Sequence, residues 1–372
     1  MEDSGGLKSS QILVGAETFM ESLSLRANEA RESLYIQAMT FEGDVAGELL
    51  IDLMINSPAK DKRLIVDSFS KVVVSDHFVF GTRYVKDSEF RAEVKNTQKL
   101  IKKARANGVQ VKFVNPTWPL MMRYPLRNHK KMMIVDGETS FIGGINFSDH
   151  NFGWQDMMVE IRDVSLAKTL VDDFLNTWNR HNHSKKVKCE SGDLYLMNGR
   201  KSQTLYKELF SLIQEAESSV TVISPYVSEP LLNILSQTSQ RGVDVKIISP
   251  RENNKGLFYN FLISKCTQAS FILKHHPGMF HLKAILIDDK KMVFGSSNFD
   301  LISYYFEQEV VLVSEESELV DAFKSQVLVP MEDESVEYTP SETSKSIKSE
   351  MIMAFLHLFC RVASSTILSP RS

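Results

Sequence analysis

Short apolar runs alternate along the chain with longer stretches in which apolar residues recur every three or four positions. Ser33 to Gln37 is the first run with the β-branched and aromatic character of a buried strand. An apolar helical stretch from Val45 to Ile55 follows, and Arg63 to Val66 is the next short run. This order predicts a strand–helix–strand unit, which is typical of α/β folds.

The same order returns in the second half of the chain. Ser219 to Ile223 reads as a strand, an apolar helical stretch begins at Pro230, and Val243 to Ile248 reads as the next strand. A polar and basic segment between the halves, Asn182 to Gly192, marks the expected boundary. The chain therefore predicts an α/β fold built from two related halves.

A chemical motif is repeated at the same place in each half. His129, Lys131 and Asp136 form the first copy, and Asn146 follows after a glycine-bearing turn. The second copy lies 152 residues further on and has the same spacing of 17 positions from histidine to asparagine: His281, Lys283, Asp288 and Asn298. A single histidine on a strand is more often structural, but two copies with matched spacing favour a functional site.

Histidine and lysine two positions apart on a strand point to the same face. A lysine ammonium is a point charge suited to a phosphate oxygen, and the asparagine amide can donate to the same oxygen. If two such sets face each other, one histidine can attack phosphorus while the other protonates the leaving oxygen. The residues thus favour phosphodiester chemistry in two steps, without a metal or another cofactor.

These residues resemble the signature of the phospholipase D superfamily, H-x-K-x4-D followed by G-x-x-N in two copies. The flanking sequences are similar to the bacterial cardiolipin synthase branch: Arg127 to Lys131, Trp154 to Asp156, Ser224 to Tyr226, Pro277 to His281, and Gly295 to Asp300 with Ser303 and Glu309. The resemblance implies two phospholipase D-like α/β halves, with mixed sheets packed face to face around one shared active site. We expect domains at 1–187 and 188–330, with a linker and an apolar tail at 331–372.

The resemblance also implies a ping-pong mechanism through a phosphohistidine. His129 is then the nucleophile and His281 the general acid and later the base, or the reverse. Lys131, Lys283, Asn146 and Asn298 would hold the phosphoryl oxygens. The motif counts Asp136 and Asp288 with the catalytic set, although their position after an apolar run suggests that they orient backbone or cross-domain groups.

Several other residues are candidates by position. Glu309 has the spacing of the family carboxylate that orients the opposite histidine, and Glu160 is a weaker candidate for that role. Arg123 and Arg127 belong to a basic run that ends at Lys131 and suits an anionic lipid headgroup or a nucleic-acid phosphate. Two residues depart from the family pattern, Ile302 in place of arginine and Glu307 in place of asparagine, which puts substrate preference in question.

Composition narrows the choice of function. Lys and Arg number 43 against 47 Asp and Glu, so the net charge of −4 argues against a general nucleic-acid binder. The three cysteines form no C-x-x-C pair, which indicates neither a disulfide framework nor a zinc site, and favours a reducing compartment. The apolar tail from Met351 contains Arg361 and is expected to lie on the protein's own surface or on a membrane.

We therefore expect a phosphatidyltransferase that makes cardiolipin from two phosphatidylglycerol molecules. Alternatives are a phospholipase D that releases phosphatidic acid, a nuclease or other phosphodiesterase, and a scaffold that only binds anionic lipid. The expected partner is an anionic phospholipid membrane and not nucleic acid. The expected location is the cytoplasm, peripheral on the inner face of the cell membrane, as a monomer or weak oligomer.

Overall fold

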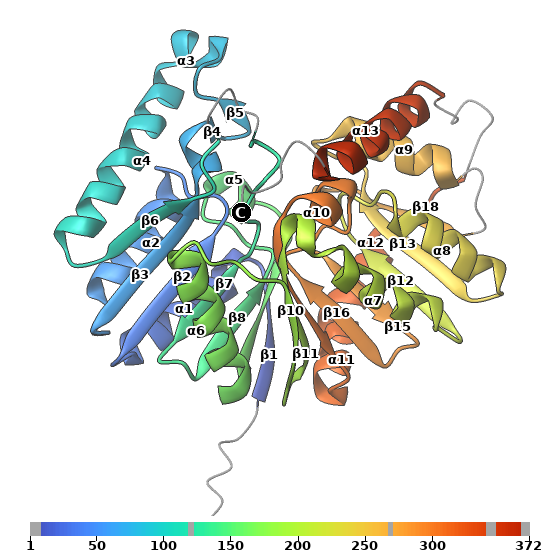
Figure 1. Cartoon of the computed structure of the whole chain (residues 1–372), viewed down its shortest axis with the longest axis horizontal. Coiled ribbons are helices and arrows are strands. Elements are labelled where there is room, and N and C mark those ends of the chain that lie inside the picture. Colours follow the sequence, from blue (N-terminus) through green and yellow to red (C-terminus); the bar gives the residue numbers. More distant parts are fainter. Residues whose placement is uncertain (1–8, 118–122, 267–270, 340–346, 366–372) are drawn as a thin grey trace, which may run out of the picture. The chain divides into compact units, whose positions relative to one another are not determined.

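The computed structural model describes residues 9–117, 123–266, 271–339 and 347–365 (Figure 1). The chain forms two compact units, Met1–His183 with Val187–Leu194 and Ser184–Lys186 with Tyr195–Ser372. Each unit is built around one mixed sheet with helices on both faces. The predicted mixed α/β class is confirmed.

The first unit holds a seven-stranded sheet in the order β1-β9-β8-β7-β2-β3-β6. Strands β2, β3 and β6 are parallel, and the pairs on the other side of β2 are antiparallel. The strands are β1 (Ser9–Val14), β2 (Ser33–Ala38), β3 (Asp61–Asp67), β6 (Gln110–Val114), β7 (Met132–Val135), β8 (Thr139–Gly143) and β9 (Met157–Arg162).

Alternate side chains of β2 serve the two faces of this sheet. Leu34 and Ile36 lie in the core shared with α1 (Ala16–Glu29), α2 (Val45–Asn56) and α4 (Ser88–Ala106). Tyr35 points the other way and stacks on Phe174 of α6 (Val164–Trp178), with ring centroids 4.8 Å apart. The remaining elements of the unit connect these: η1 (Ser68–Lys71), β4 (Val73–Val74), β5 (His77–Phe78), α3 (Thr82–Lys86) and α5 (Asp149–Phe152).

The second unit repeats the strand order of the first. Its sheet runs β10-β11-β17-β16-β15-β12-β13-β14-β18, and the seven strands from β11 to β14 correspond in order to β1-β9-β8-β7-β2-β3-β6. The pairs from β17 to β14 also run in the same relative directions as their counterparts. The strands are β10 (Lys185–Cys189), β11 (Gly192–Asn198), β12 (Ser219–Ile223), β13 (Asp244–Pro250), β14 (Ile272–His276), β15 (Ala284–Ile287), β16 (Lys291–Gly295), β17 (Gln308–Ser314) and β18 (Val336–Glu337).

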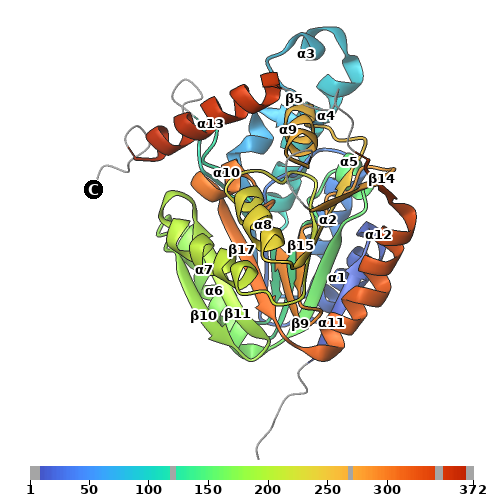
Figure 2. The ribbon, with the colours of Figure 1, turned by 90° about the vertical axis from the view of Figure 1, so that its right-hand side faces the viewer.

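Figure 2 shows helices on both faces of the second sheet, with α7 and α8 on one side and α11 and α12 on the other. The helical segments are η2 (Gly199–Lys201), α7 (Gln203–Gln214), α8 (Leu231–Gln240), α9 (Gly256–Cys266), α10 (Leu301–Tyr305), α11 (Ser317–Phe323), η3 (Lys324–Leu328), α12 (Val329–Glu334) and α13 (Ile347–Ser365). Among the helices that the structure describes, none has the length and apolar character needed to cross a bilayer.

Two segments differ from the sequence-based expectation. The polar stretch from Asn182 to Gly192 contains β10, which forms an outer strand of the second sheet. The linker expected from Met331 starts inside α12, where Met331 is buried, and continues as β18, which pairs with β14. Backbone pairing holds β10 and β18 in place, and polar composition alone gives no sign of it; residues 340–346 of the expected linker lie outside the described residues.

Candidate active site

The first motif lies where β2 and β3 end. Met132, the first residue of β7, pairs with Gln37 near the carboxyl end of β2, so His129 and Lys131 are held at that end of the sheet. The second motif has the same placement, because Ala284 of β15 pairs with Ile223 at the end of β12. Both histidines and both motif lysines are buried.

Each motif lysine makes the same bond. Lys131 Nζ donates to the carbonyl oxygen of His129 at 2.8 Å, and Lys283 Nζ donates to the carbonyl oxygen of His281. The bond ties the ammonium to the backbone of the histidine it accompanies. A buried ammonium is thus fixed at the backbone of each motif histidine, and a lysine ammonium suits the binding of an anionic phosphoryl group.

The two asparagines follow the next strand of each unit and are also buried. Asn146 accepts a bond from the Thr40 backbone amide at 3.1 Å, so its carboxamide is oriented by the segment after β2. Within the part of the chain that the structure describes, Asn298 Oδ1 has no hydrogen-bond partner. Both asparagines therefore lie at the same end of their sheet as the motif histidine.

Arg127 supports the first motif from within the protein. The sequence predicts a substrate contact for it, but its buried guanidinium pairs with Asp67 and donates to the carbonyl oxygens of Asn115 and Arg123 at 3.0 and 2.7 Å. Asp67 also accepts from the backbone amide of Asn128 at 2.6 Å. These bonds fix the loop before His129 to the end of β3, so we assign Arg127 to support of the loop.

The carboxyl of Asp67 is fully enclosed. Burial raises its pKa to about 6, while the charge of Arg127 and the bond from the Asn128 amide act in the opposite direction. Sequence reasoning missed this residue. Its only signal is an aspartate that ends an apolar strand, and its partner lies 60 positions away.

The basic run before Lys131 carries less open charge than its composition suggests. Lys130 is buried and paired with Asp173 of α6 at 2.6 Å, and Arg127 is paired with Asp67. Arg123 is exposed to solvent. Two of the four cations in this run therefore hold the motif in the unit, and Arg123 stays a candidate for substrate contact.

The motif aspartates lie at the far end of their strands. Asp136 follows β7 and accepts bonds of 2.8 Å from the backbone amides of Arg31, Glu32 and Ser33, at the start of β2. Asp288 binds the amides of Glu217, Ser218 and Ser219 in the same way. Both have positive φ, 53° and 51°.

These contacts shift the protonation of both aspartates. Partial burial would raise the pKa of Asp136 and of Asp288, but the bonds from backbone amides outweigh it. The pKa of Asp136 is lowered, and that of Asp288 falls to about 2. The ionised carboxylates therefore fasten the end of one strand to the start of its neighbour.

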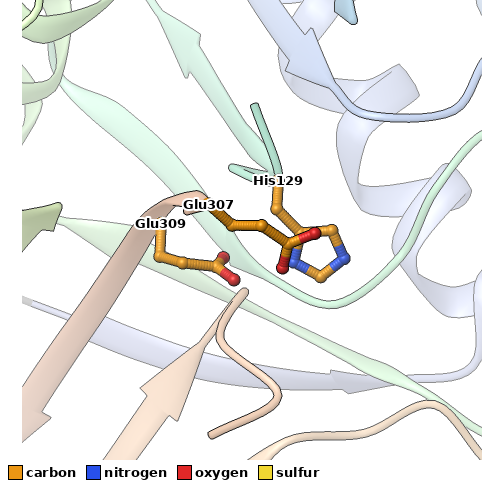
Figure 3. Close-up of side chains that lie close together, drawn as sticks. All are labelled: His129, Glu307 and Glu309. Carbon is orange, nitrogen blue, oxygen red and sulfur yellow. The ribbon is translucent and has the colours of Figure 1, made fainter. Parts of the chain in front are cut away.

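Glu309 lies at the start of β17 within a network of hydroxyl groups. Ser296 and Ser303 both donate to its buried carboxylate, the latter at 2.8 Å. Ser303 Oγ also lies 3.0 Å from the carboxylate of Glu307, whose side chain is drawn beside that of Glu309 in Figure 3. The Ser303 hydroxyl therefore links the two carboxyl groups.

Glu160 has a different setting. Arg26 Nε lies 2.8 Å from its carboxylate, and Ser22 Oγ donates to it at 2.5 Å. Both partners belong to α1 of the same unit. Glu160 thus joins β9 to α1.

Three carboxylates of the first unit lie close enough together to bind a metal ion. Glu42, Asp44 and Glu93 of the first unit have oxygens within 4.8 Å of one another. Asp44 caps α2 by accepting from Gly47 at 3.0 Å, and Glu93 accepts from Ser75. Glu42 accepts a bond from the Ser75 backbone amide, so all three carboxylates have structural partners, and the expectation that no metal takes part stays a prediction.

Comparison with known proteins gives a consistent result. A family model described as cardiolipin synthase, PLD-like domain, matches residues 24–178 and 209–328. The chain is 24% identical to Cardiolipin synthase A of Pseudomonas putida (strain W619) over 368 residues, covering 92% of this chain and 72% of that protein. It is 23% identical to Major cardiolipin synthase ClsA of Bacillus subtilis (strain 168), covering 85% and 68%.

Two solved structures share the fold. A phosphatidylserine synthase from Haemophilus influenzae Rd KW20 has a TM-score of 0.69 at 14% identity, over 96% of this chain and 94% of that one. A polyphosphate kinase from Porphyromonas gingivalis has a TM-score of 0.60 at 11% identity, over 96% and 56%. At these identities the likeness concerns the fold.

Proposed function

The chain belongs to the family of cardiolipin synthases with PLD-like domains, and on this basis we propose that it joins two phosphatidylglycerol molecules into cardiolipin with release of glycerol. One observation carries the proposal: each unit holds a histidine just before corresponding strands, β7 and β15, with the following lysine bonded to the histidine carbonyl. A displacement through a covalent enzyme intermediate needs two such groups.

The proposed reaction has two steps at one shared site. In the first, the His129 imidazole attacks the phosphorus of one phosphatidylglycerol, a P–N bond forms, and the P–O bond to glycerol breaks. His281, protonated, gives its proton to the departing glycerol oxygen. In the second, His281 accepts the proton of a glycerol hydroxyl of another phosphatidylglycerol, whose oxygen attacks phosphorus and releases His129.

The remaining candidates take supporting roles in this proposal. Lys131, Lys283, Asn146 and Asn298 hold the phosphoryl oxygens and stabilise the charge that develops on them. Glu309 orients the opposite histidine, since a carboxylate bound to one ring nitrogen fixes the tautomer. Arg123 is proposed to contact the anionic headgroup. Because the substrate is a membrane lipid, we propose that the enzyme works at the inner face of the cell membrane.

The test is an analysis of products by mass spectrometry after incubation with phosphatidylglycerol vesicles. We expect cardiolipin and free glycerol in equal amounts, and a loss of at least about 10³-fold for H129A and for H281A. H181A is the matched control, because His181 is exposed and outside both motifs, and it should keep full activity. Protein that releases no glycerol from phosphatidylglycerol would overturn the proposal.

Two further readouts refine the result. Phosphatidic acid in place of cardiolipin would identify a phospholipase D that uses water as the acceptor. A phosphatidyl group found on the peptide with His129 would establish it as the nucleophile, and one found on the peptide with His281 would exchange the two roles.

A further inference from the structure

Each unit exposes large apolar side chains at the end of its sheet that carries the motif histidine. In the first unit these are Phe78, Phe80 and Val85, here called the tip, in the segment with β5 and α3 (Figure 1). In the second unit they are on α13: Met351, Phe355, Leu358, Phe359 and Val362, here called the outer face of α13. Contiguous exposed apolar surface marks a binding site more often than chance exposure.

The tip is tied to the catalytic end of the first sheet. The segment that carries it leaves the sheet after Asp67, the residue that fixes the loop before His129. Phe78 packs against Tyr124 of that loop, with ring centroids 5.8 Å apart. Phe80 and Val85 nevertheless stay 74% and 77% exposed.

The outer face of α13 is equally tied to the second motif. One face of the helix packs on α9 and α10, which lie at the same end of the sheet as His281. Tyr305 Oη lies 3.1 Å from His357 Nε2 across this contact, and Cys360 is buried in it. The opposite face leaves Phe355 and Leu358 68% and 61% exposed.

The charges on α13 select the kind of partner. Lys348 and Arg361 are both exposed and positive, whereas the single acid of the helix, Glu350, accepts a bond from Ser264 of α9. An apolar stripe flanked by cations is the pattern of a helix that lies in the interface of an anionic bilayer. The sequence predicted that this tail lies either on the protein's own surface or on a membrane. One face of α13 packs on α9 and α10, and the opposite, exposed face is available to a membrane.

We infer that the tip and the outer face of α13 are the surfaces by which the enzyme binds an anionic phospholipid bilayer. This rests on the proposed function only in that the substrate lies in such a bilayer. Each unit presents its exposed apolar surface on a different kind of element. The first unit uses the segment after β3, and the second uses α13. In both, the apolar groups lie at the end of the sheet from which lipid would enter.

The experiment is vesicle flotation with vesicles of equal parts phosphatidylglycerol and phosphatidylcholine. We expect F355S/L358S and F80S/V85S each to weaken binding about tenfold or more, because each removes two large apolar side chains from the interface. V329S and V164S are matched controls, since Val329 of α12 and Val164 of α6 are half exposed and belong to neither surface, and should bind as the wild type does. R361Q should weaken binding to these vesicles about threefold and leave binding to pure phosphatidylcholine unchanged.

A second measurement covers the case in which a double variant fails to fold. F355W should show a blue shift of tryptophan emission on addition of vesicles that the wild type lacks. Equal binding of wild type and both double variants, or an equal loss in V329S and V164S, would overturn the inference. So would a stable dimer that F355S/L358S dissociates and that does not float with vesicles, because the outer face of α13 would then serve a second copy.

Flotation needs no turnover, so the two proposals fail separately. Binding that depends on these residues in a protein that makes no cardiolipin would retain the membrane surfaces and reject the proposed reaction. Cardiolipin synthesis by a protein whose vesicle binding ignores these residues would do the reverse.

Discussion

Asp136 and Asp288 lie at the end of their strands opposite the histidines. Each aspartate lies seven positions after its histidine, which corresponds to about 20 Å along an extended chain. The carboxylates bind backbone amides at the start of the neighbouring strand. The motif therefore combines groups suited to chemistry with a carboxylate that holds the strand in register.

D288N should accordingly affect stability and leave chemistry nearly intact. The folded-state pKa of Asp288, about 2, is below its unfolded value, so the ionised carboxylate stabilises the fold above about pH 4. That contribution is lost as the pH falls toward 2. We expect urea unfolding to show D288N less stable than wild type at pH 7, with a smaller difference at pH 3.

The same variant tests whether Asp288 takes part in the chemistry. Activity of D288N, measured below its unfolding temperature, should stay within about threefold of wild type. D289N is the control, because Asp289 is the exposed neighbour with a similar positive φ, and it should change neither property. A loss of activity above a hundredfold with unchanged stability would place Asp288 in the chemistry.

At the residue scale, the spacing of the repeated motif was a better guide to the site than the charge of the basic run before Lys131. The pattern of His129 and Lys131 predicted two side chains on one face of a strand, but both residues precede β7, and the Lys131 ammonium bonds the backbone carbonyl of His129. The basic run was interpreted as open positive charge, but Arg127 and Lys130 have buried acidic partners. Those partners, Asp67 and Asp173, lie 60 and 43 positions away, and a single sequence does not record such pairs.

Among the elements, the loop before His129 depends most on one tertiary contact. Arg127 joins it to the end of β3, and the ion pair with Asp67 is almost fully buried. Removing one partner of a buried pair leaves the other charge without compensation. The position of the loop before His129 therefore depends on this pair.

R127A should destabilise the first unit by about 3–5 kcal/mol, as judged by urea unfolding, because the carboxylate of Asp67 stays buried. R127A/D67N should lose clearly less than the sum of the two single variants. K60A is the control: its pair with Glu32 is exposed on both sides, so its loss should be at most about 1 kcal/mol. Equal losses in R127A and K60A would contradict the assigned role.

The elements differ in how well their sequences predict them. Buried strands such as β2 and β12, and the helix α2, follow from apolar runs and helical periodicity and start within a residue or two of the expected positions. β10 and β18 have polar sequences and gain their order from backbone pairing at the sides of the second sheet. Backbone hydrogen bonds do not depend on residue type, so composition does not predict strands of this kind.

For the molecule as a whole, the repeated strand order is the main finding. Seven strands recur in the same order in both units, and each copy places a histidine at the same end. The repeated motif predicted this duplication. How the two units combine into one site is part of the proposed function, because each unit alone supplies one histidine.

Mixing inactive variants tests that combination. If one chain supplies both histidines to its own site, H129A and H281A should each be inactive, and an equimolar mixture should regain less than about 1% of wild-type activity. A site shared between two chains would behave differently, because a mixed dimer can pair the intact first motif of one chain with the intact second motif of the other. Such a mixture would recover up to about a quarter of wild-type activity for random pairing.

The measurement is cardiolipin formation by the mixture after incubation at high protein concentration, which favours exchange of subunits. H181A mixed with wild type is the control for the effect of mixing itself, since His181 belongs to neither motif. Recovery near a quarter would show that the site forms between chains. If the mixture recovers no activity and the control keeps full activity, the two halves of one chain complete one site between them.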